Sequence, residues 1–257
     1  MGNSLLLLGD GPEVLELAVR MKTAGHTPEL VNWGAPREGA FPDDPLLGEV
    51  RTKAKKAEYI VEFVEGSLEG KREALEAASG SRASLVLSSS LRAGPTEVGS
   101  WLSGGEIVAG FSGLPPYAER KRIELQRGLE TAEPAWNAAR ELWKSCGFEV
   151  EEMGDHPGGV QLRAVCCLVN EAVSLLSEGS AAAADIDTAM KLGTNYPEGP
   201  LRWADLIGLD RVLAVLDGLE REYREDRYRS VPLLRKHVLA GWLGQKQGRG
   251  FFTYPEA

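Results

Sequence analysis

A chain of 257 residues, 43% of them apolar and 26% charged, can bury one large core or two moderate ones and is not typical of a disordered protein. Its net charge of −9 argues against the basic face that nucleic-acid binding requires, so no nucleic-acid partner is expected. No apolar run reaches the ~18 residues of a membrane span and the three cysteines cannot all pair, so we expect a cytoplasmic protein with reduced thiols and no membrane partner.

The first half of the chain alternates short apolar runs with helical stretches. The runs are at 4–8, 28–33, 57–64, 83–89, 106–111 and 148–153. Helical patterns lie between most of them, for example at 67–79 and 134–146, and the first helix stops at Gly25. Strands that are apolar almost throughout and alternate with helices are typical of a doubly wound parallel sheet. We therefore predict an α/β, Rossmann-like domain over residues 1–154.

The segment between the second and third predicted strands departs from this alternation. Residues 34–49 contain several prolines and glycines, which predicts a loop followed at most by a short basic helix that ends near Lys56.

The second half of the chain changes character after the sequence GDHPGG. A helix is predicted over 160–178, and because it is apolar on both sides we expect it to lie centrally or in an oligomer interface. Further helices are predicted at 183–193, 209–223 and 231–244, before a glycine-rich C-terminal strand or coil. These patterns predict an all-helical domain over residues 155–257.

The first strand breaks on Gly9-Asp10-Gly11, which is how a dinucleotide-binding unit begins. Gly9 and Gly11 supply two of the three glycines that let the backbone approach a pyrophosphate, but Val14 stands at the third position. Pro12 also removes an N–H from the helix end that faces the phosphates. From the turn alone, a nucleotide site that is retained and one that has been lost are equally consistent with the sequence.

Asn32 ends the second predicted strand, where an acidic side chain would accept both ribose hydroxyls. A neutral amide loses charge assistance, which is worth a factor of about two in bond strength. It also no longer repels a 2′-phosphate, so the choice between NAD, NADP and no cofactor stays open.

Two long segments of the second half carry a resemblance to a known family. They are DIDTAMKLGTNYPEGPLRWADLIGLDRVL and PLLRKHVLAGWLGQKQGRGFFTY, and they resemble the C-terminal domain of the L-3-hydroxyacyl-CoA dehydrogenases. The N-terminal half aligns more loosely through AGH, AEYIVEFVEGSLEGKR and IELQRGLET. The resemblance implies a Rossmann-like domain followed by a helical domain through which the chain forms a homodimer.

The resemblance also implies the family reaction, the NAD-linked interconversion of L-3-hydroxyacyl-CoA and 3-oxoacyl-CoA in fatty acid metabolism, with an acyl-CoA as partner and no metal. In that reaction a His removes the hydroxyl proton, a Glu orients this His, and Ser and Asn side chains hold the substrate oxygen. The catalytic Glu falls on Glu124 and the Ser on Ser89, with Ser88 or Ser90 as neighbouring registers. Phe111 stands at the His position, or Ser112 if the register slides by one residue, and Leu162 stands at the Asn position.

Three further residues match the cofactor side of the family. Glu62 and Glu65 flank the loop after the third predicted strand, which in the family reaches the nicotinamide half of NAD, and Lys71 matches a lysine of the following helix. Each of these three residues fits a charged side chain on a helix face as well as it fits a contact with the cofactor. In the second half, Asn195 and Glu198 belong either to a remodelled pocket or to a surface turn.

These substitutions predict weak or absent turnover, because a general base contributes ~10² to 10⁴ in rate. The three imidazoles, at His26, His156 and His237, are expected to be structural or exposed, and Glu124 is expected to pair with a nearby basic residue. The loop at 34–49 is also too short to form the helical arm with which the family clamps CoA. Two alternatives stay open: a non-catalytic, dimeric nucleotide- or acyl-CoA-binding protein (a pseudoenzyme), and a dehydrogenase for another small hydroxy acid.

Overall fold

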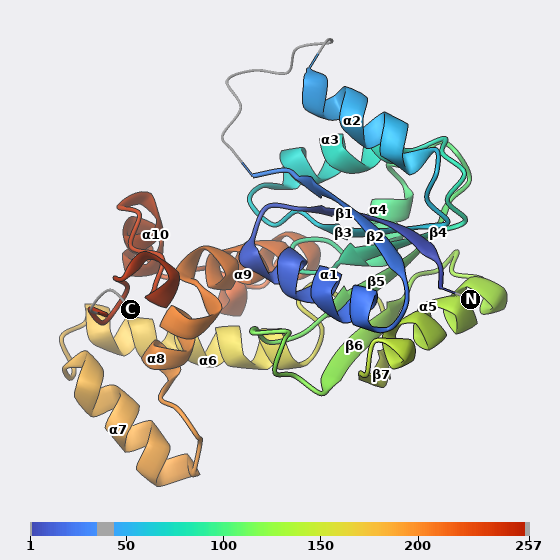
Figure 1. The fold of residues 1–257 in the computed structure, drawn as a ribbon. Helices are drawn as coiled ribbons and strands as arrows, with labels where there is room; N and C mark the ends of the chain where they lie inside the picture. The colour runs from blue at the N-terminus through green and yellow to red at the C-terminus, as the bar shows by residue number, and fades with distance from the viewer. Residues whose placement is uncertain (1, 35–43, 255–257) are drawn as a thin grey trace. The chain divides into compact units, whose positions relative to one another are not determined.

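The computed structural model describes residues 2–34 and 44–254, which fall into two compact units, 1–159 and 160–257 (Figure 1). The division follows Gly159, whereas the sequence pattern placed it after Gly154. Each unit is built around elements that the apolar pattern predicts, so the two are described in turn.

Unit 1 contains a seven-stranded sheet with the strand order β2-β1-β3-β4-β5-β6-β7. Its strands are β1 (Ser4–Gly9), β2 (Thr27–Asn32), β3 (Tyr59–Phe63), β4 (Leu85–Ser89), β5 (Ile107–Ser112), β6 (Arg122–Arg127) and β7 (Glu149–Met153). The α/β prediction is confirmed, with one correction. Strand β6 was not predicted, and it pairs with β5 in the antiparallel direction, so the sheet is only mostly parallel.

Helices cover both faces of the sheet, which is why its strands are apolar in succession. Helices α1 (Pro12–Thr23) and α5 (Glu133–Ser145) lie on one face, and α2 (Pro45–Ala54), α3 (Leu68–Ala78) and α4 (Pro95–Gly99) on the other (Figure 1). Leu5 and Leu7 of β1 pack into the first core, and Leu6 and Leu8 into the second.

Helix α2 confirms the short basic helix that the sequence predicts after the proline-rich loop. Its residues Leu47, Val50 and Ala54 are buried in the core of the second face. In the part of the 34–56 segment that the structure describes, α2 packs on the sheet and no helical arm projects from it. Residues 35–43 of the predicted loop lie outside the described residues.

Unit 2 is helical, as predicted. It contains α6 (Gln161–Ser177), α7 (Ala183–Thr194), α8 (Pro200–Ile207), α9 (Leu209–Tyr223) and α10 (Pro232–Leu239), with short 3-10 turns at Asp226–Tyr228 and Gln245–Gln247. Helix α8 was not predicted separately. The predicted C-terminal strand or coil consists of isolated bridges that join Arg249 to Gly244 and to Thr253. No helix in the described part of the chain is long and apolar enough to cross a membrane.

The acidic residues of the family-like motifs hold unit 2 together. The carboxylate of Asp187 accepts hydrogen bonds from the N–H groups of Leu201 (2.8 Å) and Arg202 (3.0 Å), and it thereby caps the start of α8. Asp205 accepts from the N–H groups of Phe251 and Phe252 and from the hydroxyl of Tyr254 (3.0 Å), which fastens the C-terminal segment. Burial raises the pKa of both carboxyl groups.

Candidate active site

The carboxyl ends of β1 and β3 flank the place where a sheet of this kind binds ligands. The chain leaves β1 through α1 to form β2 on one side, and it returns to form β3 on the other side of β1. This reversal of strand order is a topological switch point, and the crevice outside the strand ends is the usual ligand site. We call the space between the turn after β1 (residues 10–11) and the turn after β3 (residues 64–66) the switch-point crevice.

Val14 packs against the glycine turn after β1. A Cβ atom on Gly9 would lie 2.6 Å from Val14 Cγ2, so the first residue of the turn must be small. Val14 itself is buried in the core, Gly11 caps α1 in an extended conformation, and Pro12 is the first residue of the helix. The first turn of α1 therefore offers one N–H fewer to an anion than a turn without proline.

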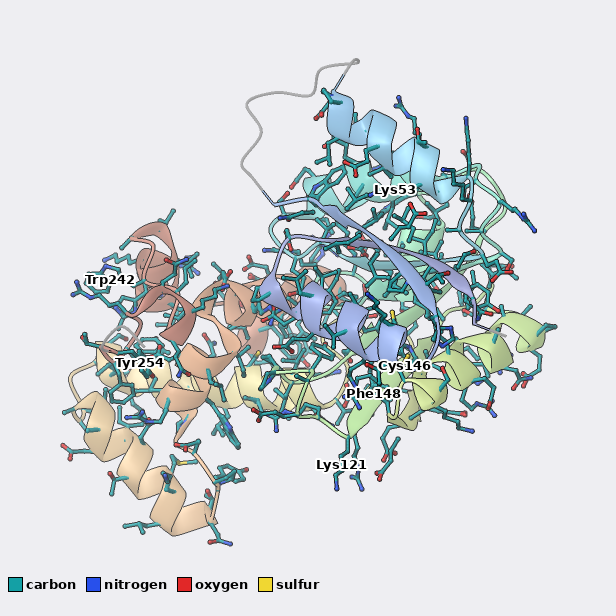
Figure 2. All side chains as sticks on the ribbon, in the orientation of Figure 1. Lys53, Lys121, Cys146, Phe148, Trp242 and Tyr254 are labelled. Atoms are coloured by element: carbon teal, nitrogen blue, oxygen red, sulfur yellow. The ribbon has the colours of Figure 1, made fainter. Side chains whose placement is uncertain are left out.

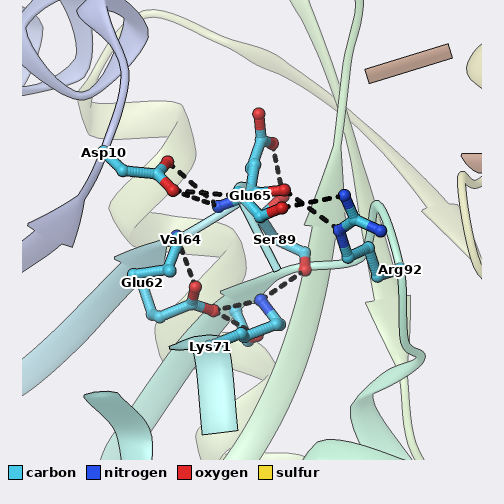
Figure 3. A network of polar contacts seen from close by, with 9 residues as sticks. Asp10, Glu62, Val64, Glu65, Lys71, Ser89 and Arg92 are labelled. Carbon is cyan, nitrogen blue, oxygen red and sulfur yellow. Dashed lines mark hydrogen bonds and ion pairs between the residues drawn. The ribbon is translucent and has the colours of Figure 1, made fainter. Parts of the chain in front are cut away.

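Asp10, which the sequence reasoning did not single out, bridges the switch-point crevice (Figure 3). Its two carboxylate oxygens accept the N–H of Glu65 at 3.0 and 3.1 Å, and Oδ2 also accepts the N–H of Gly66 at 2.7 Å. The Arg92 guanidinium donates to the carbonyl oxygens of the same two residues, at 3.0 and 3.1 Å. The turn after β3 is thus held from both its amide and its carbonyl side.

The predicted residues Glu65 and Ser89 lie together beside this turn. Ser89 Oγ donates to Glu65 Oε1 at 2.9 Å, and both side chains are buried. Asn32 does not join them, because its Oδ1 accepts the N–H of Gly34 at 3.0 Å and its side chain is exposed. This local turn is one that asparagine commonly forms.

Glu62 and Lys71 form a buried ion pair below the crevice (Figure 3). Glu62 is fully buried and also accepts the hydroxyl of Ser88 at 2.6 Å, while Lys71 Nζ donates to the carbonyl of Ser89 at 2.8 Å. Burial raises the pKa of Glu62, and the Lys71 charge and the hydrogen bonds oppose that rise. Neither side chain is a charge on an exposed helix face, so this pair is a scaffold for the ends of β3 and β4.

Ser112 and Glu124 face each other across the antiparallel pair of β5 and β6. Ser112 Oγ donates to Glu124 Oε2 at 2.8 Å, and Gln126 Nε2 donates to Ser112 Oγ at 3.2 Å. All three side chains are at most 2% exposed. Gly159, at a φ of +59°, lies against them: a Cβ there would stand 2.0 Å from Glu124 Oε2 and 2.3 Å from Ser112 Oγ.

Phe111 points to the other face of the sheet. Its ring is fully buried, with centroid distances of 4.9 Å to Trp143 and 5.7 Å to Phe63. Side chains alternate along a strand, so only one of Phe111 and Ser112 can face Glu124. The structure places Ser112, the residue of the alternative register, opposite Glu124, and it places Phe111 on the other face.

Two of the basic residues near Glu124 in the sequence make contacts with other groups. Arg122 contacts Glu149 and Glu151, and Arg120 donates to backbone carbonyl oxygens. Lys121 is exposed and points away from the sheet (Figure 2).

The third serine of the LSSSL segment, Ser90, differs from its neighbours. Its hydroxyl is buried and has no hydrogen-bond partner among the described residues. It lies beside Gly110, since a Cβ on that glycine would stand 2.2 Å from Ser90 Oγ. Ser88 and Ser89, by contrast, both donate to glutamates of the turn and strand next to them.

The three imidazoles have structural or exposed positions. His26 Nδ1 accepts the N–H of Asn3 at 3.1 Å and its Nε2 lies 2.8 Å from Ser145 Oγ; burial lowers its pKa. His237 packs against aromatic rings in unit 2, and burial also lowers its pKa. His156 is exposed, with its ring next to Gly154 and its N–H directed at Gln126 Oε1 (3.4 Å).

The predicted site residues of the second half lie within unit 2. Leu162 is 1% exposed in α6. Asn195 ends α7 in a left-handed conformation and is exposed, and Glu198 lies 3.5 Å from Lys191 in an ion pair. These positions favour the surface turn over the remodelled pocket.

Comparison with known proteins supports the resemblance. The family model of the 3-hydroxyacyl-CoA dehydrogenase C-terminal domain matches residues 158–254. A probable 3-hydroxyacyl-CoA dehydrogenase of Caenorhabditis elegans is 31% identical over 210 residues, which are 80% of this chain and 67% of that protein. The chain belongs to the 3-hydroxyacyl-CoA dehydrogenase family.

Other members of the 3-hydroxyacyl-CoA dehydrogenase family agree. A probable 3-hydroxybutyryl-CoA dehydrogenase of Bacillus subtilis is 40% identical over 161 residues, which are 63% of this chain and 56% of that protein. The (S)-3-hydroxybutyryl-CoA dehydrogenase of Ralstonia eutropha, a solved structure, aligns over all of both chains with a TM-score of 0.78 and 26% identity. This chain spans about half the length of several curated relatives, including a 3-hydroxybutyryl-CoA dehydrogenase of Bradyrhizobium diazoefficiens (51%).

The family cofactor, NAD, does not fit the switch-point crevice in the described conformation. The Asn32 side chain is bonded to the N–H of Gly34. The backbone amides of Glu65 and Gly66, on the side that the resemblance assigns to the nicotinamide half, are already bonded to a carboxylate. The residues that should face a dinucleotide are therefore bonded to one another.

Proposed function

We propose that this chain is a 3-hydroxyacyl-CoA dehydrogenase homologue in which the family reaction is weak or absent. That reaction is the NAD-linked interconversion of L-3-hydroxyacyl-CoA and 3-oxoacyl-CoA. The supporting observation is the bond from Ser112 Oγ to Glu124 Oε2, at the position where the resemblance implies an imidazole. A serine hydroxyl does not titrate near neutral pH, so it cannot take up the proton of the substrate alcohol as an imidazole base would, and a lost general base costs ~10² to 10⁴ in rate.

The substrate side of the proposal follows the named relatives. Several of them are 3-hydroxybutyryl-CoA dehydrogenases, so a short 3-hydroxyacyl-CoA is the substrate to test. Helix α2 packs on the sheet, and the described residues between β2 and β3 supply no projecting arm that would clamp the CoA part. We therefore expect weak binding of the thioester as well as slow chemistry.

The test is reduction of acetoacetyl-CoA with millimolar NADH, followed by the loss of NADH absorbance. We expect the unmodified protein to show no saturable turnover, or a rate at least ~10²-fold below that of an active relative measured in parallel. Ser112→His places an imidazole opposite Glu124 and is expected to raise the rate tenfold or more, with a new dependence on the titration of that ring near pH ~6.5.

Phe111→His is the matched control, because it adds the same imidazole one residue away on the opposite face of β5, which packs against Trp143. It is expected to lower stability without raising the rate. Rapid, saturable turnover by the unmodified protein, free of contaminating enzyme, would refute the proposal. If the unmodified protein shows a slow rate and His156→Ala abolishes it, the exposed imidazole of His156 is the general base. The proposal that the protein lacks a base would then be wrong.

A further inference from the structure

We propose that Asp10 is an autoinhibitory latch, an internal anion that occupies the switch-point crevice and competes with the phosphates of a dinucleotide. The inference rests on the proposed function only in taking the family's dinucleotide as the ligand. It concerns binding, whereas the proposed function concerns the loss of the base at Ser112.

The first step of the argument is the position of Asp10. It is the middle residue of the turn after β1, and its carboxylate reaches the amides of the turn after β3, 55 and 56 residues away in the chain. The carboxyl ends of these two strands are the walls of the crevice. A side chain that joins them closes the space that a dinucleotide must enter.

The second step is the chemistry of the groups that Asp10 uses. Successive backbone N–H groups in a turn form an anion-binding concavity. Here the amides of Glu65 and Gly66 both point at Asp10 Oδ2, at 3.1 and 2.7 Å. A Cβ on Gly66 would lie 2.9 Å from the same oxygen, so a larger residue there would crowd the Asp10 carboxylate. The carboxylate therefore occupies donors that would otherwise be available to a phosphate or a ribose.

The third step is that the turn cannot simply rotate its amides toward a ligand. The Arg92 guanidinium donates to the carbonyl oxygens of Glu65 and Gly66, and the Ser89 hydroxyl donates to the Glu65 carboxylate. A dinucleotide must therefore displace the Asp10 carboxylate or bind beside it. The first breaks charge-assisted hydrogen bonds, and the second places two anions together in one crevice. Both effects weaken binding.

The experiment measures NADH affinity by fluorescence or calorimetry, with Ser112 unchanged. Asp10→Asn removes the charge while keeping the shape, and Asp10→Gly removes the latch. We expect both variants to bind NADH about tenfold more tightly than the unmodified protein, or more, since each factor of ten is only about 1.4 kcal/mol. Glu106→Gln is the matched control: Glu106 also accepts a backbone N–H, that of Gly80 at 2.6 Å, but it lies before the amino end of β5, away from the carboxyl ends of the parallel strands. Its NADH affinity should not change.

Hydrogen exchange supplies a second readout. The amides of Glu65 and Gly66 should be protected in the unmodified protein, exposed in Asp10→Gly and protected again when NADH is added to that variant. A parallel titration with CoA, which also carries a pyrophosphate, identifies the ligand. Tight NADH binding by the unmodified protein, no gain in folded Asp10→Asn, or a gain for CoA alone would each overturn the latch. None of these results requires turnover, so the latch and the missing base fail independently.

Discussion

The buried pair of Glu62 and Lys71 supports the most quantitative prediction. Both side chains are at most 1% exposed, and the Lys71 ammonium is bonded to the Glu62 carboxylate and to the carbonyl of Ser89. Lys71→Met leaves a buried carboxylate without its counter-charge, which costs about 3–5 kcal/mol in unfolding free energy. The carbonyl of Ser89 loses a donor as well, at about 1 kcal/mol. The expected destabilisation of unit 1 is therefore about 4 kcal/mol or more.

The pH dependence of this variant has a definite sign. Burial raises the pKa of Glu62, and Lys71 is the main opposing charge. Without Lys71 the folded-state pKa lies further above the unfolded value of ~4.3, so folding favours the protonated acid. Stability is then retained below the unfolded pKa and is lost as the pH rises through the folded pKa. The cost of Lys71→Met should be larger at pH ~8 than at pH ~5.

Hydrogen exchange of β3 and β4 in increasing urea is a suitable assay, because it reports unit 1 separately from unit 2. Arg72→Met is the matched control: Arg72 is the next residue of α3, and its pair with Glu76 is about half exposed, so its loss should cost less than about 1 kcal/mol. Glu62→Leu combined with Lys71→Met should cost at least ~2 kcal/mol less than the sum of the single changes. Strict additivity, or a cost for Lys71→Met no larger than that for Arg72→Met, would refute the reasoning.

Two further predictions concern unit 1. Gly159→Ala should destabilise it by clearly more than Gly80→Ala in urea unfolding. Both glycines have a positive φ, but only a Cβ at position 159 would clash with Glu124. A Cβ at position 80 has no neighbour within 4 Å, so Gly80→Ala carries only the backbone cost of ~1–2 kcal/mol. Equal costs would show that the 159 segment moves aside. Because burial lowers the pKa of His26, its neutral ring stabilises the fold above the unfolded pKa of ~6.5, and this stabilisation is lost as the pH falls below that value. His26→Gln should therefore flatten the loss of unit 1 stability between pH ~7.5 and ~5.5 in urea unfolding, and an unchanged pH profile would contradict the prediction.

Much of the fold could be predicted because its elements bury a regular apolar pattern. Helix α9 spans the predicted residues 209–223, and the first strand is recognisable from four successive leucines that fill both cores. Strand β6 was missed because its inward-facing residues on one side, Glu124 and Gln126, are polar and yet fully buried. Polar side chains that alternate with apolar ones normally predict a strand face exposed to solvent. Only the pairing of β6 with β5 shows that these polar side chains are buried.

The site could be predicted less well because its geometry depends on register and on distant turns. Phe111 and Ser112 are adjacent, and a slip of one residue exchanges the faces of a strand, so the choice between them requires the pairing of β5 with β6. The bond from Asp10 to the amides of Glu65 and Gly66 joins segments 55 and 56 residues apart, and no local pattern encodes it. An acidic residue between the two glycines of a nucleotide turn was the available signal.

Ser112 and Asp10, which lie at the ends of β5 and β1, both satisfy buried or turn polar groups. A buried polar group without a hydrogen bond is costly in a protein core. Here Ser112 donates to that carboxylate and accepts in turn from Gln126, while Asp10 satisfies the amides of the neighbouring crevice. These contacts stabilise the fold through groups that a ligand would need to engage. The imidazole of Ser112→His is larger than the buried hydroxyl that it replaces and disturbs its bonds with Glu124 and Gln126, so a gain in rate from this variant should come with a loss in stability.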